Sequence, residues 1–536
     1  MARILLAGEA TWHKTGYANY GKNILTLLKK RGHEVAEISA FGYSNDDRHK
    51  ECDWKIYFCD PDENNEEEKA AFENSLASAI GGWKLEFAAL DFLPDYVISF
   101  RDPWVDRYIG ESPLKKYFNW IFMPTCDAIP LDSNWIESFK QADAVLTYSN
   151  WALEEIKKYN HINLIKSAPP AAEGRIFFPM DEGLGKKSFG LPQDTFVFGT
   201  VMRNQERKLF PGLFQTFRTF LDRLPIKKRK KVKMVCHTSY PDVGWDIPRI
   251  LIENNIENYV YFTNMCMECK CTFLTKWNST FKMCPKCGGQ NVVFPGPSSG
   301  FSRERLSFLY NAMDFYIQYA GLEGFGMPMV EASYCGIPVA ATDYSAMSSV
   351  VREIDGFPIK VSGFYTESNS HRKIAVPDGE HLIKIMTDYM NTTEDVKNSK
   401  RVAVHQAAIK NFDYEKSCQV WEDAINSVPA KNNWFSSPEP LLNGGSQTAK
   451  TNAEITSSNY KKMNIDDMDF DWQKIYGIKS LNCGLFDKNS LGVTVQNQRF
   501  ISFKDDDMQG MIGAKIQNII FWENKRIKMI KSRKTK

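Results

Sequence analysis

The sequence predicts an α/β protein made of two doubly wound domains that face each other across a cleft. Short apolar runs alternate with amphipathic helical segments in two separate series, one starting at the N-terminus and one near residue 195. A chain of 536 residues is also too long for one hydrophobic core. Two paired-cysteine motifs inside the second series predict a small metal-binding insertion.

The first series opens with an apolar run at residues 3–7 that ends in Gly8, as a buried central strand does. A helical segment starts at Gly16 and closes at Gly32, and a second strand follows at residues 34–38. Further strand-like runs lie at residues 96–100, 120–123 and 144–148. The acidic run at 64–69 predicts a solvated helix face.

The second series repeats this alternation. Its strand-like runs are residues 196–199, 233–236, 259–262, 315–317 and 338–341. Alternating strands and helices form parallel sheets covered by helices on both faces, so each series predicts one Rossmann-like domain.

The predicted boundaries follow from the extents of the two series, from the cysteine pairs and from a stretch rich in Ser, Asn, Gly, Pro and Thr. They are a first domain at 1–185, a second at 186–412 with an insertion at 265–298, a linker at 429–458 and a small C-terminal appendix at 459–536. The appendix contains strand-like runs at 491–495 and 500–503. It finishes in a basic stretch from Lys525 to Lys536, which we expect to be a solvated end rather than a docking segment.

Composition narrows the class of protein. The chain has 43% hydrophobic and 25% charged residues, as soluble proteins do, and its formal charge of +2 argues against an extensive basic surface for nucleic acid. No stretch approaches the roughly 18 apolar residues of a membrane-spanning helix, and the opening MARILLAGEA predicts a buried strand rather than a signal peptide. The twelve cysteines are scattered apart from one cluster, which favours a reducing, cytoplasmic setting.

The most informative segment runs from Glu323 to Glu331, after a strand and into a helix. Gly324 and Gly326 let the backbone approach a ligand, and the start of a helix offers free N–H groups to a diphosphate. Carboxylates eight residues apart can reach a sugar and a ribose of one ligand. By itself, the segment is also compatible with an acidic pair at a helix start, although ligand binding is the favoured interpretation.

A second segment follows the first strand of the second series. Arg203 and Lys208 lie on the loop at the carboxyl end of that strand, where ligands of α/β proteins bind. Arginine grips two phosphate oxygens and lysine adds a mobile point charge. The pair therefore favours phosphate binding over the alternative of two surface cations.

These two segments together resemble the donor site of family 4 retaining glycosyltransferases of GT-B fold. The resemblance extends over roughly residues 1–428 and includes motifs beginning at Gly16, Gly32, Tyr148, Cys236 and Leu309. It implies that a helix at 413–428 crosses back and completes the first domain. It also implies transfer of a sugar from a nucleotide-diphosphate sugar to an acceptor hydroxyl, with retention of configuration and without a catalytic metal.

The resemblance implies roles for individual residues. Arg203 and Lys208 would neutralise the departing diphosphate, and Glu323 would hold the donor sugar. The donor-binding positions would be Gly16, Asn204, Gly324, Phe325, Gly326 and Glu331, with Glu331 on the ribose and Gly16 reaching the diphosphate from the opposite domain.

One segment departs from the family pattern. Many relatives place a histidine after a strand of the first domain, whereas residues 123–130 of this chain have none. Because some relatives have an aspartate there, Asp127 is the candidate for an acceptor-side role. His13 and the pair Arg101-Asp102 are weaker candidates, each equally compatible with a structural role.

Two Cys-x2-Cys pairs, separated by fourteen residues, predict a zinc ribbon in the second domain. The expected ligands are Cys266, Cys269, Cys284 and Cys287, and four thiolates leave no open position for a catalytic water, so we expect structural zinc. Cys271 is a spare thiol or a replacement for Cys269.

The ribbon is either a metal staple for a long insertion or a docking surface for an acceptor, a partner or a nucleic acid. Its candidate residues for docking are Lys270, Lys276, Trp277, Lys282 and Lys286. The alternatives to an ordinary glycosyltransferase are therefore one that acts on modified DNA through the ribbon, and a nucleic-acid-binding or partner-binding protein that uses the ribbon or the basic tail. The donor base, the sugar and the acceptor, whether glycan, lipid, protein or DNA, stay open.

Overall fold

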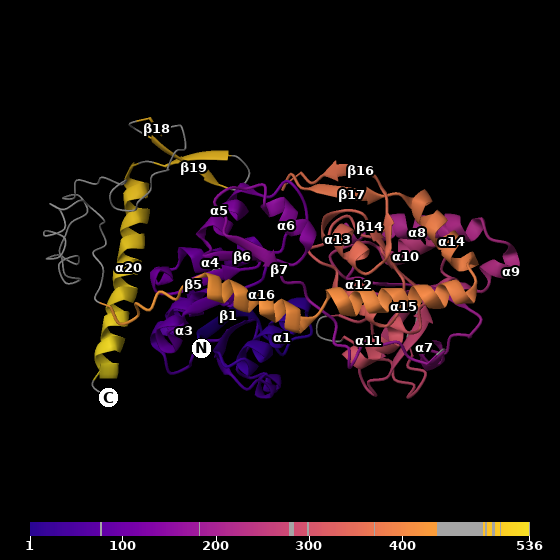
Figure 1. The fold of residues 1–536 in the computed structure, drawn as a ribbon, viewed down its shortest axis with the longest axis horizontal. Coiled ribbons are helices and arrows are strands. Elements are labelled where there is room, and N and C mark those ends of the chain that lie inside the picture. The colour runs from indigo at the N-terminus through magenta and orange to yellow at the C-terminus, as the bar shows by residue number, and fades with distance from the viewer. Residues whose placement is uncertain are drawn as a thin grey trace.

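The computed structural model describes residues 1–436 except 76–77, 182, 278–282, 297–299 and 369, and then 486–487, 490–495, 499–503 and 505–534. Two domains, each a parallel sheet between helices, lie side by side (Figure 1). The predicted fold class is confirmed. Within the described residues, no helix has the length and apolar character needed to cross a membrane.

The first domain contains a seven-stranded parallel sheet in the order β3-β2-β1-β4-β5-β6-β7. Its strands are β1 (Arg3–Glu9), β2 (Glu34–Ala40), β3 (Lys55–Phe58), β4 (Tyr96–Ser99), β5 (Asn119–Phe122), β6 (Ala144–Thr147) and β7 (Leu164–Ser167). The predicted strands are confirmed. The two edge strands, β3 and β7, escaped prediction because an edge strand is only partly buried and needs no continuous apolar run.

Helices and short 3-10 turns cover both faces of this sheet. The helices are α1 (Gly16–Lys30), α2 (Glu66–Glu73), α3 (Leu85–Phe92), α4 (Pro103–Glu111), α5 (Ser133–Gln141) and α6 (Asn150–Ile156). The 3-10 turns are η1 (Asp47–Glu51), η2 (Ser78–Ile80), η3 (Gly82–Lys84) and η4 (Lys115–Tyr117). The predicted acidic helix face corresponds to α2, except that Glu68 is buried and pairs with Lys84.

The second domain contains a larger sheet in the order β11-β10-β9-β8-β13-β14-β15, and β12 also pairs with β10. The strands are β8 (Phe196–Val201), β9 (Val232–His237), β10 (Val260–Cys266), β11 (Thr272–Lys276), β12 (Val292–Val293), β13 (Phe315–Gln318), β14 (Val339–Thr342) and β15 (Phe357–Ile359). A separate antiparallel hairpin, β16 (Val361–Thr366) and β17 (Lys373–Pro377), projects from this domain.

The helical elements of the second domain are α7 (Leu184–Ser188), η5 (Glu206–Lys208), α8 (Phe210–Asp222), α9 (Ile226–Arg229), α10 (Ile247–Glu253), α11 (Arg303–Tyr310), α12 (Met327–Tyr334), α13 (Ser345–Glu353), α14 (Gly379–Asn391) and α15 (Glu394–Asn411). Helix α7 packs against α11. The predicted boundary between residues 185 and 186 therefore falls inside a helix of the second domain.

Helix α16 (Tyr414–Ser427) returns to the first domain, and together with α15 it forms a band along both domains (Figure 1). Its Trp421 is fully buried and donates a hydrogen bond to the hydroxyl of Tyr20 in α1 at 2.8 Å. Arg31, at the C-terminal end of α1, pairs with Glu422 at 2.5 Å. The crossover helix therefore packs where the resemblance implied.

The chain beyond α16 stays attached to the first domain. Residues 429–436, predicted as the start of a linker, run along its surface, where Asn119 donates to the carbonyl of Pro429 at 2.9 Å and Trp434 donates to that of Pro94 at 2.9 Å. The rest of the predicted linker, 437–458, lies outside the described residues. The predicted runs of the appendix are strands: β18 (Phe486–Asp487), β19 (Ser490–Val495) and β20 (Arg499–Phe503).

The prediction of a solvated basic end is wrong. Helix α20 (Asp505–Lys534) stands against the first domain beside α3 (Figure 1). Trp522 packs edge-on against Phe87, and Arg526 is fully buried, with its guanidinium 4.2 Å from the ring centre of Tyr117. Trp522 and Arg526 are four residues apart and therefore lie on one face of the helix. The lysines between and after them made the segment look uniformly solvated in the sequence.

We predict that Arg526→Ala lowers the free energy of unfolding by about 2–4 kcal/mol. The change removes the buried guanidinium, so two backbone carbonyls lose their hydrogen-bond donor and Glu523 loses its ion-pair partner. Arg526 donates to the carbonyls of Trp434 at 2.6 Å and Ser436 at 3.0 Å. Thermal and denaturant unfolding measure the effect. The matched control is Lys528→Ala, which removes an exposed cation of the same helix; equal stability of the two variants would contradict the prediction.

A buried carboxyl supports the loop that leads into α1. Glu37 of β2 is 1% exposed and accepts hydrogen bonds from Thr11 at 2.7 Å and Trp54 at 3.0 Å. Burial raises the pKa of Glu37 to about 7, although both donors act in the opposite direction. The folded chain therefore holds this proton more tightly than the unfolded chain does.

We predict a corresponding loss of stability with rising pH. The contribution of protonated Glu37 is complete below the ordinary pKa of 4.5 and is lost as the pH rises through about 7. Between about pH 5 and about pH 8, the wild type should lose up to about 3 kcal/mol more than Glu37→Gln. Unfolding curves of both proteins across this range test the prediction, and parallel curves would refute it.

Candidate active site at the domain junction

The residues of the two predicted segments meet at the carboxyl edge of the second sheet. Lys208 lies in η5, after β8, and Glu323 follows β13, the neighbouring strand. Both side chains are buried and form an ion pair. Glu323 also accepts hydrogen bonds from Gln318 at 2.6 Å and Arg207 at 2.9 Å.

Arg203 lies outside this cluster. Its half-exposed guanidinium binds both oxygens of Asp242 at 2.8 and 2.9 Å, and this pairing lowers the pKa of Asp242 to about 2. Arg207, which the sequence analysis did not single out, occupies the place beside Glu323. Its adjacency to Lys208 on the same strand-end loop was the signal that could have identified it.

Asn204 is fully buried, and its side chain is committed to the protein. Its amide nitrogen donates to the carbonyl of Trp245 at 2.8 Å, and its amide oxygen accepts from the backbone N–H of Trp245 at 2.9 Å. Asn204 therefore ties the strand-end loop to residues 239–246, and its side chain is not available to a ligand.

The glycines after Glu323 have separate structural reasons. Gly326, which precedes the first residue of α12, has a φ of +95°. Only glycine adopts this backbone conformation readily. A Cβ on Gly324 would lie 2.3 Å from the Thr125 methyl group of the first domain, so the two domains meet there. Phe325 packs edge-on against Phe412.

Gly16 lies across the junction from the start of α12. Its nearest neighbour is the side chain of Met327, 4.0 Å from where a Cβ would stand. The first residue of α1 and the first residue of α12 therefore face each other, and each helix presents its N-terminus to the same region.

Glu331 lies in α12 and accepts a hydrogen bond from the hydroxyl of Tyr310 at 2.8 Å. Burial raises the pKa of Glu331, while Tyr310 and then Arg303 act in the opposite direction. The structure thus places Glu331 one to two turns along the helix that begins next to Glu323.

The first domain contributes carboxylates to the junction. Both oxygens of Asp127 accept hydrogen bonds at 3.1 Å from Arg372, which lies next to β17 in the second domain. Asp102 accepts from the hydroxyl of Tyr17 at 3.1 Å, and burial raises the pKa of Asp102. Burial lowers the pKa of Arg207, whereas the charges of Asp127, Tyr17 and Asp102 act in the opposite direction.

The remaining candidates lie elsewhere. Arg101 is buried and forms an ion pair with Asp106 at 2.6 Å, which holds the start of α4. His13 is partly buried beside Trp12, and burial lowers the pKa of His13. Neither side chain reaches the Glu323 cluster through a contact among the described residues.

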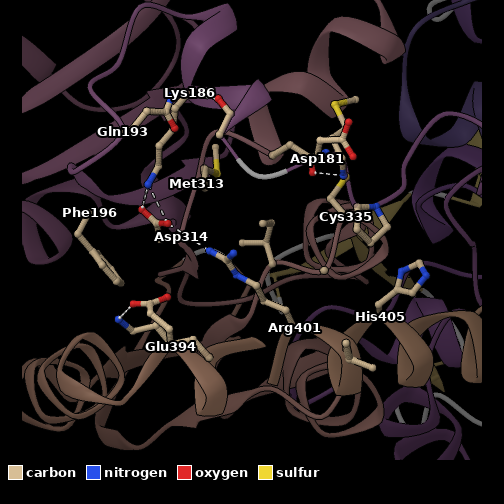
Figure 2. Close-up of a pocket in the computed structure, with 18 of the residues that line it drawn as sticks. Asp181, Lys186, Gln193, Phe196, Met313, Asp314, Cys335, Glu394, Arg401 and His405 are labelled. Atoms are coloured by element: carbon tan, nitrogen blue, oxygen red, sulfur yellow. Dashed lines mark hydrogen bonds and ion pairs between the residues drawn. The ribbon is translucent and has the colours of Figure 1, made fainter. Parts of the chain in front are cut away.

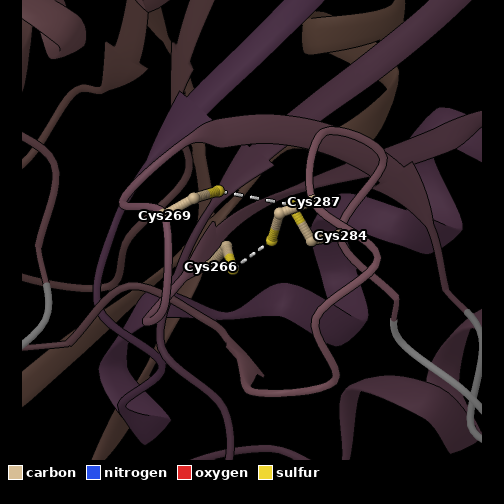
Figure 3. Close-up of side chains that lie close together, drawn as sticks. All are labelled: Cys266, Cys269, Cys284 and Cys287. Atoms are coloured by element: carbon tan, nitrogen blue, oxygen red, sulfur yellow. Dashed lines mark hydrogen bonds between the residues drawn. The ribbon is translucent and has the colours of Figure 1, made fainter.

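The four predicted zinc ligands come together at the end of β10 (Figure 3). The sulfur atoms of Cys266 and Cys287 are 3.7 Å apart, those of Cys269 and Cys284 are 3.6 Å apart, and all four lie within 4.8 Å of one another. Tetrahedral Zn²⁺ at about 2.3 Å from each thiolate requires sulfurs about 3.8 Å apart, so the set fits this ion.

The ribbon is part of the sheet rather than a separate module. Strands β11 and β12, which belong to the ribbon, both pair antiparallel with β10, the strand that carries Cys266. The backbone N–H of Lys286 points at the sulfur of Cys284 and that of Gly289 at the sulfur of Cys287, each at 3.4 Å. Lys282, one of the docking candidates, lies outside the described residues.

We predict one zinc ion per chain, held without Cys271. The Cys271 sulfur lies 3.2 Å from that of Cys284, close enough to compete with Cys269, but the four-cysteine set uses Cys269. Cys269→Ser should therefore abolish tight zinc binding and Cys271→Ser should retain it. Metal analysis of both purified variants decides the question, and the reverse pattern would mean that the ligand is Cys271.

A pocket with room for about 500 Å³ lies at the opposite, amino edge of the second sheet (Figure 2). At its centre Asp314, which precedes β13, pairs with Lys186 at 2.8 Å and with Arg401 at 3.2 Å. Asp314 also accepts from the backbone N–H of Val197 at 2.7 Å. The two ion pairs and the hydrogen bond join α7, α15 and β8 through Asp314. None of the predicted site residues lines the pocket.

Comparison with known proteins agrees with this architecture. Residues 283–402 match the family model described as glycosyl transferases group 1. No curated protein matches the chain significantly.

Solved structures share its fold. Sucrose-phosphate synthase from Thermosynechococcus elongatus superposes with a TM-score of 0.57 at 14% identity, covering 80% of this chain and 99% of its own. A glycosyltransferase from Rickettsia africae gives 0.54 at 13% identity, with 80% and 98% covered. HepE of Anabaena in complex with UDP and glucose gives 0.54 at 12% identity, with 80% and 100% covered. The fold is therefore that of the GT-B glycosyltransferases, and the family match supports the same class of enzyme.

Proposed function

We propose that this protein is a retaining glycosyltransferase that transfers a sugar from a nucleotide-diphosphate sugar to an acceptor hydroxyl. The observation that carries the proposal is the buried Lys208–Glu323 pair at the start of α12, on the strand ends where ligands of doubly wound sheets bind. The match of residues 283–402 to group 1 glycosyl transferases covers Glu323, Glu331 and α12.

The proposed chemistry is stabilisation of a leaving group. When the bond between the sugar and the diphosphate breaks, negative charge develops on the phosphate oxygens. Lys208, Arg207 and the positive end of the α12 dipole are fixed positive groups close to that charge, with Arg203 as a further cation at the rim. Attack by the acceptor on the same face of the sugar would retain configuration without a dedicated base or a catalytic metal.

The donor would be held by carboxylates as well as cations. We assign the ribose to Glu331 and the sugar hydroxyls to Glu323, whose oxygens are occupied by Gln318, Arg207 and Lys208. A bound sugar would replace part of this hydrogen bonding. Because HepE shares the fold and binds UDP and glucose, a UDP-hexose is the first donor to test.

The acceptor side is proposed for the first domain. Asp127 and Asp102 act on the charge of Arg207 in the second domain, and Arg372 holds Asp127 from that domain. An acceptor hydroxyl between them would donate to a carboxylate, which suits a polyol acceptor such as a sugar.

We predict that Glu331→Ala and Lys208→Ala lose donor turnover by at least about a hundredfold, since each removes a charged contact to the donor in a water-poor site. Circular dichroism and thermal unfolding verify that the variants fold. Lys227→Ala, an exposed cation of α9, is the matched control and should keep full activity.

The measurement is a thermal-shift and donor-hydrolysis screen against a panel of nucleotide sugars, followed by acceptor trials with the donor that binds. NMR of the product establishes whether configuration is retained. Full activity in either variant would refute the residue assignment. If no nucleotide sugar binds the wild type, the proposed function itself fails.

A further inference from the structure

The zinc ribbon contacts the donor-site half of the second domain through four aromatic rings, here called the aromatic brace: Tyr240, Phe262, Trp277 and Phe294. Trp277 and Phe294 stack with their ring centres 5.2 Å apart and 12° between their planes. Tyr240 meets Trp277 edge-on at 5.0 Å, and Phe262 meets it edge-on at 5.7 Å.

The brace draws on both halves of the ribbon. Trp277 directly follows β11, on the chain after the first pair of cysteines, and Phe294 directly follows β12, on the chain after the second pair. A metal held by the four cysteines would join these two halves, because each Cys-x2-Cys pair supplies two of the four sulfurs. Closing the ribbon around zinc therefore brings the two stacked rings together.

Tyr240 of the aromatic brace belongs to the loop 239–246, which connects the brace to the strand-end loop of the donor site. In this loop Asp242 binds Arg203 at 2.8 and 2.9 Å, and the hydroxyl of Ser239 accepts from the backbone N–H of Asn204 at 3.4 Å. Trp245 exchanges two backbone hydrogen bonds with the Asn204 side chain.

The fit between this loop and the strand-end loop 203–206 is tight. The indole N–H of Trp245 donates to the carbonyl of Glu206 at 3.0 Å, two residues before Lys208. A Cβ on Gly244 would lie 2.6–2.7 Å from atoms of Asn204, so the two loops pack backbone to backbone. A displacement of the loop 239–246 would therefore move the segment from Arg203 to Lys208.

We propose that the zinc ribbon is a positioning device for the donor site: through the aromatic brace it holds the loop 239–246, and through that loop it sets the segment that carries Arg203, Arg207 and Lys208. The inference rests on the proposed function for the identity of the ligand. It assigns Tyr240, Trp277 and Phe294 as positioning residues that touch no substrate, and it makes donor affinity, rather than acceptor affinity, depend on the ribbon.

The first experiment needs no ligand. Amide hydrogen exchange of the zinc-loaded full chain is compared between wild type, Trp277→Ala and Trp277→Phe. Faster exchange in peptides spanning 203–208 and 239–246 is expected for Trp277→Ala, with Trp277→Phe close to wild type because it retains a ring. Met283→Ala, which changes an exposed side chain of the same ribbon, is the matched control and should leave both peptides unchanged.

The second experiment measures function. Trp277→Ala should raise the donor Kd and KM about fivefold, as loss of one or two aromatic pairs would, with the acceptor KM and the zinc content unchanged. If Trp277→Ala loses zinc or fails to fold, Tyr240→Ala, which lies outside the ribbon, is measured instead and should give the same pattern.

Unchanged exchange in residues 203–208 and 239–246 of a zinc-loaded brace variant would overturn the inference, as would an increase confined to the acceptor KM. This outcome is distinct from failure of the proposed function, which would leave the wild type without nucleotide binding but would not alter the exchange result.

Discussion

The buried carboxylate of Glu323 is the constraint around which the second half of this protein is arranged. A charge removed from water is costly unless it is paired and hydrogen-bonded, and here Lys208, Arg207 and Gln318 converge on one side chain. Their convergence requires neighbouring parallel strands, β8 and β13, that end at the same edge, and α12 then starts at Met327. The same arrangement concentrates positive groups where a diphosphate would lie.

Several additions to the two-domain frame act on this region. The hairpin β16–β17 brings Arg372 onto Asp127 of the first domain. The ribbon extends β10 and reaches the loop that holds Arg203. Helix α20 does not join this region: it packs on the first domain, with Arg526 as its buried contact. The hairpin and the ribbon therefore contact the region of the candidate site, whereas α20 packs on the first domain.

Much of the candidate site was predictable because its residues lie next to each other in sequence. Glu323, Gly324, Gly326 and Glu331 are one segment, and its position after a strand and at a helix start could be inferred from local patterns. The four cysteines were predictable for the same reason, since each pair lies on one turn. The choice between Arg203 and Arg207 was not predictable. Both residues lie on the loop after β8, and only packing decides which one faces Glu323.

The sequence by itself determined the two alternating series of strands and helices, the glycine-rich helix start and the four-thiolate set, because each depends on residues close in the chain. Tertiary structure alone decided that Arg203 turns to Asp242, that Asn204 is committed to Trp245, that Arg372 meets Asp127, and that the basic tail is a docked helix. The first three contacts join residues between 39 and 245 positions apart, and the hydrogen bond from Tyr117 to Glu523 of the docked helix spans 406 positions. Their partners are set by how domains and loops pack, which no local pattern records.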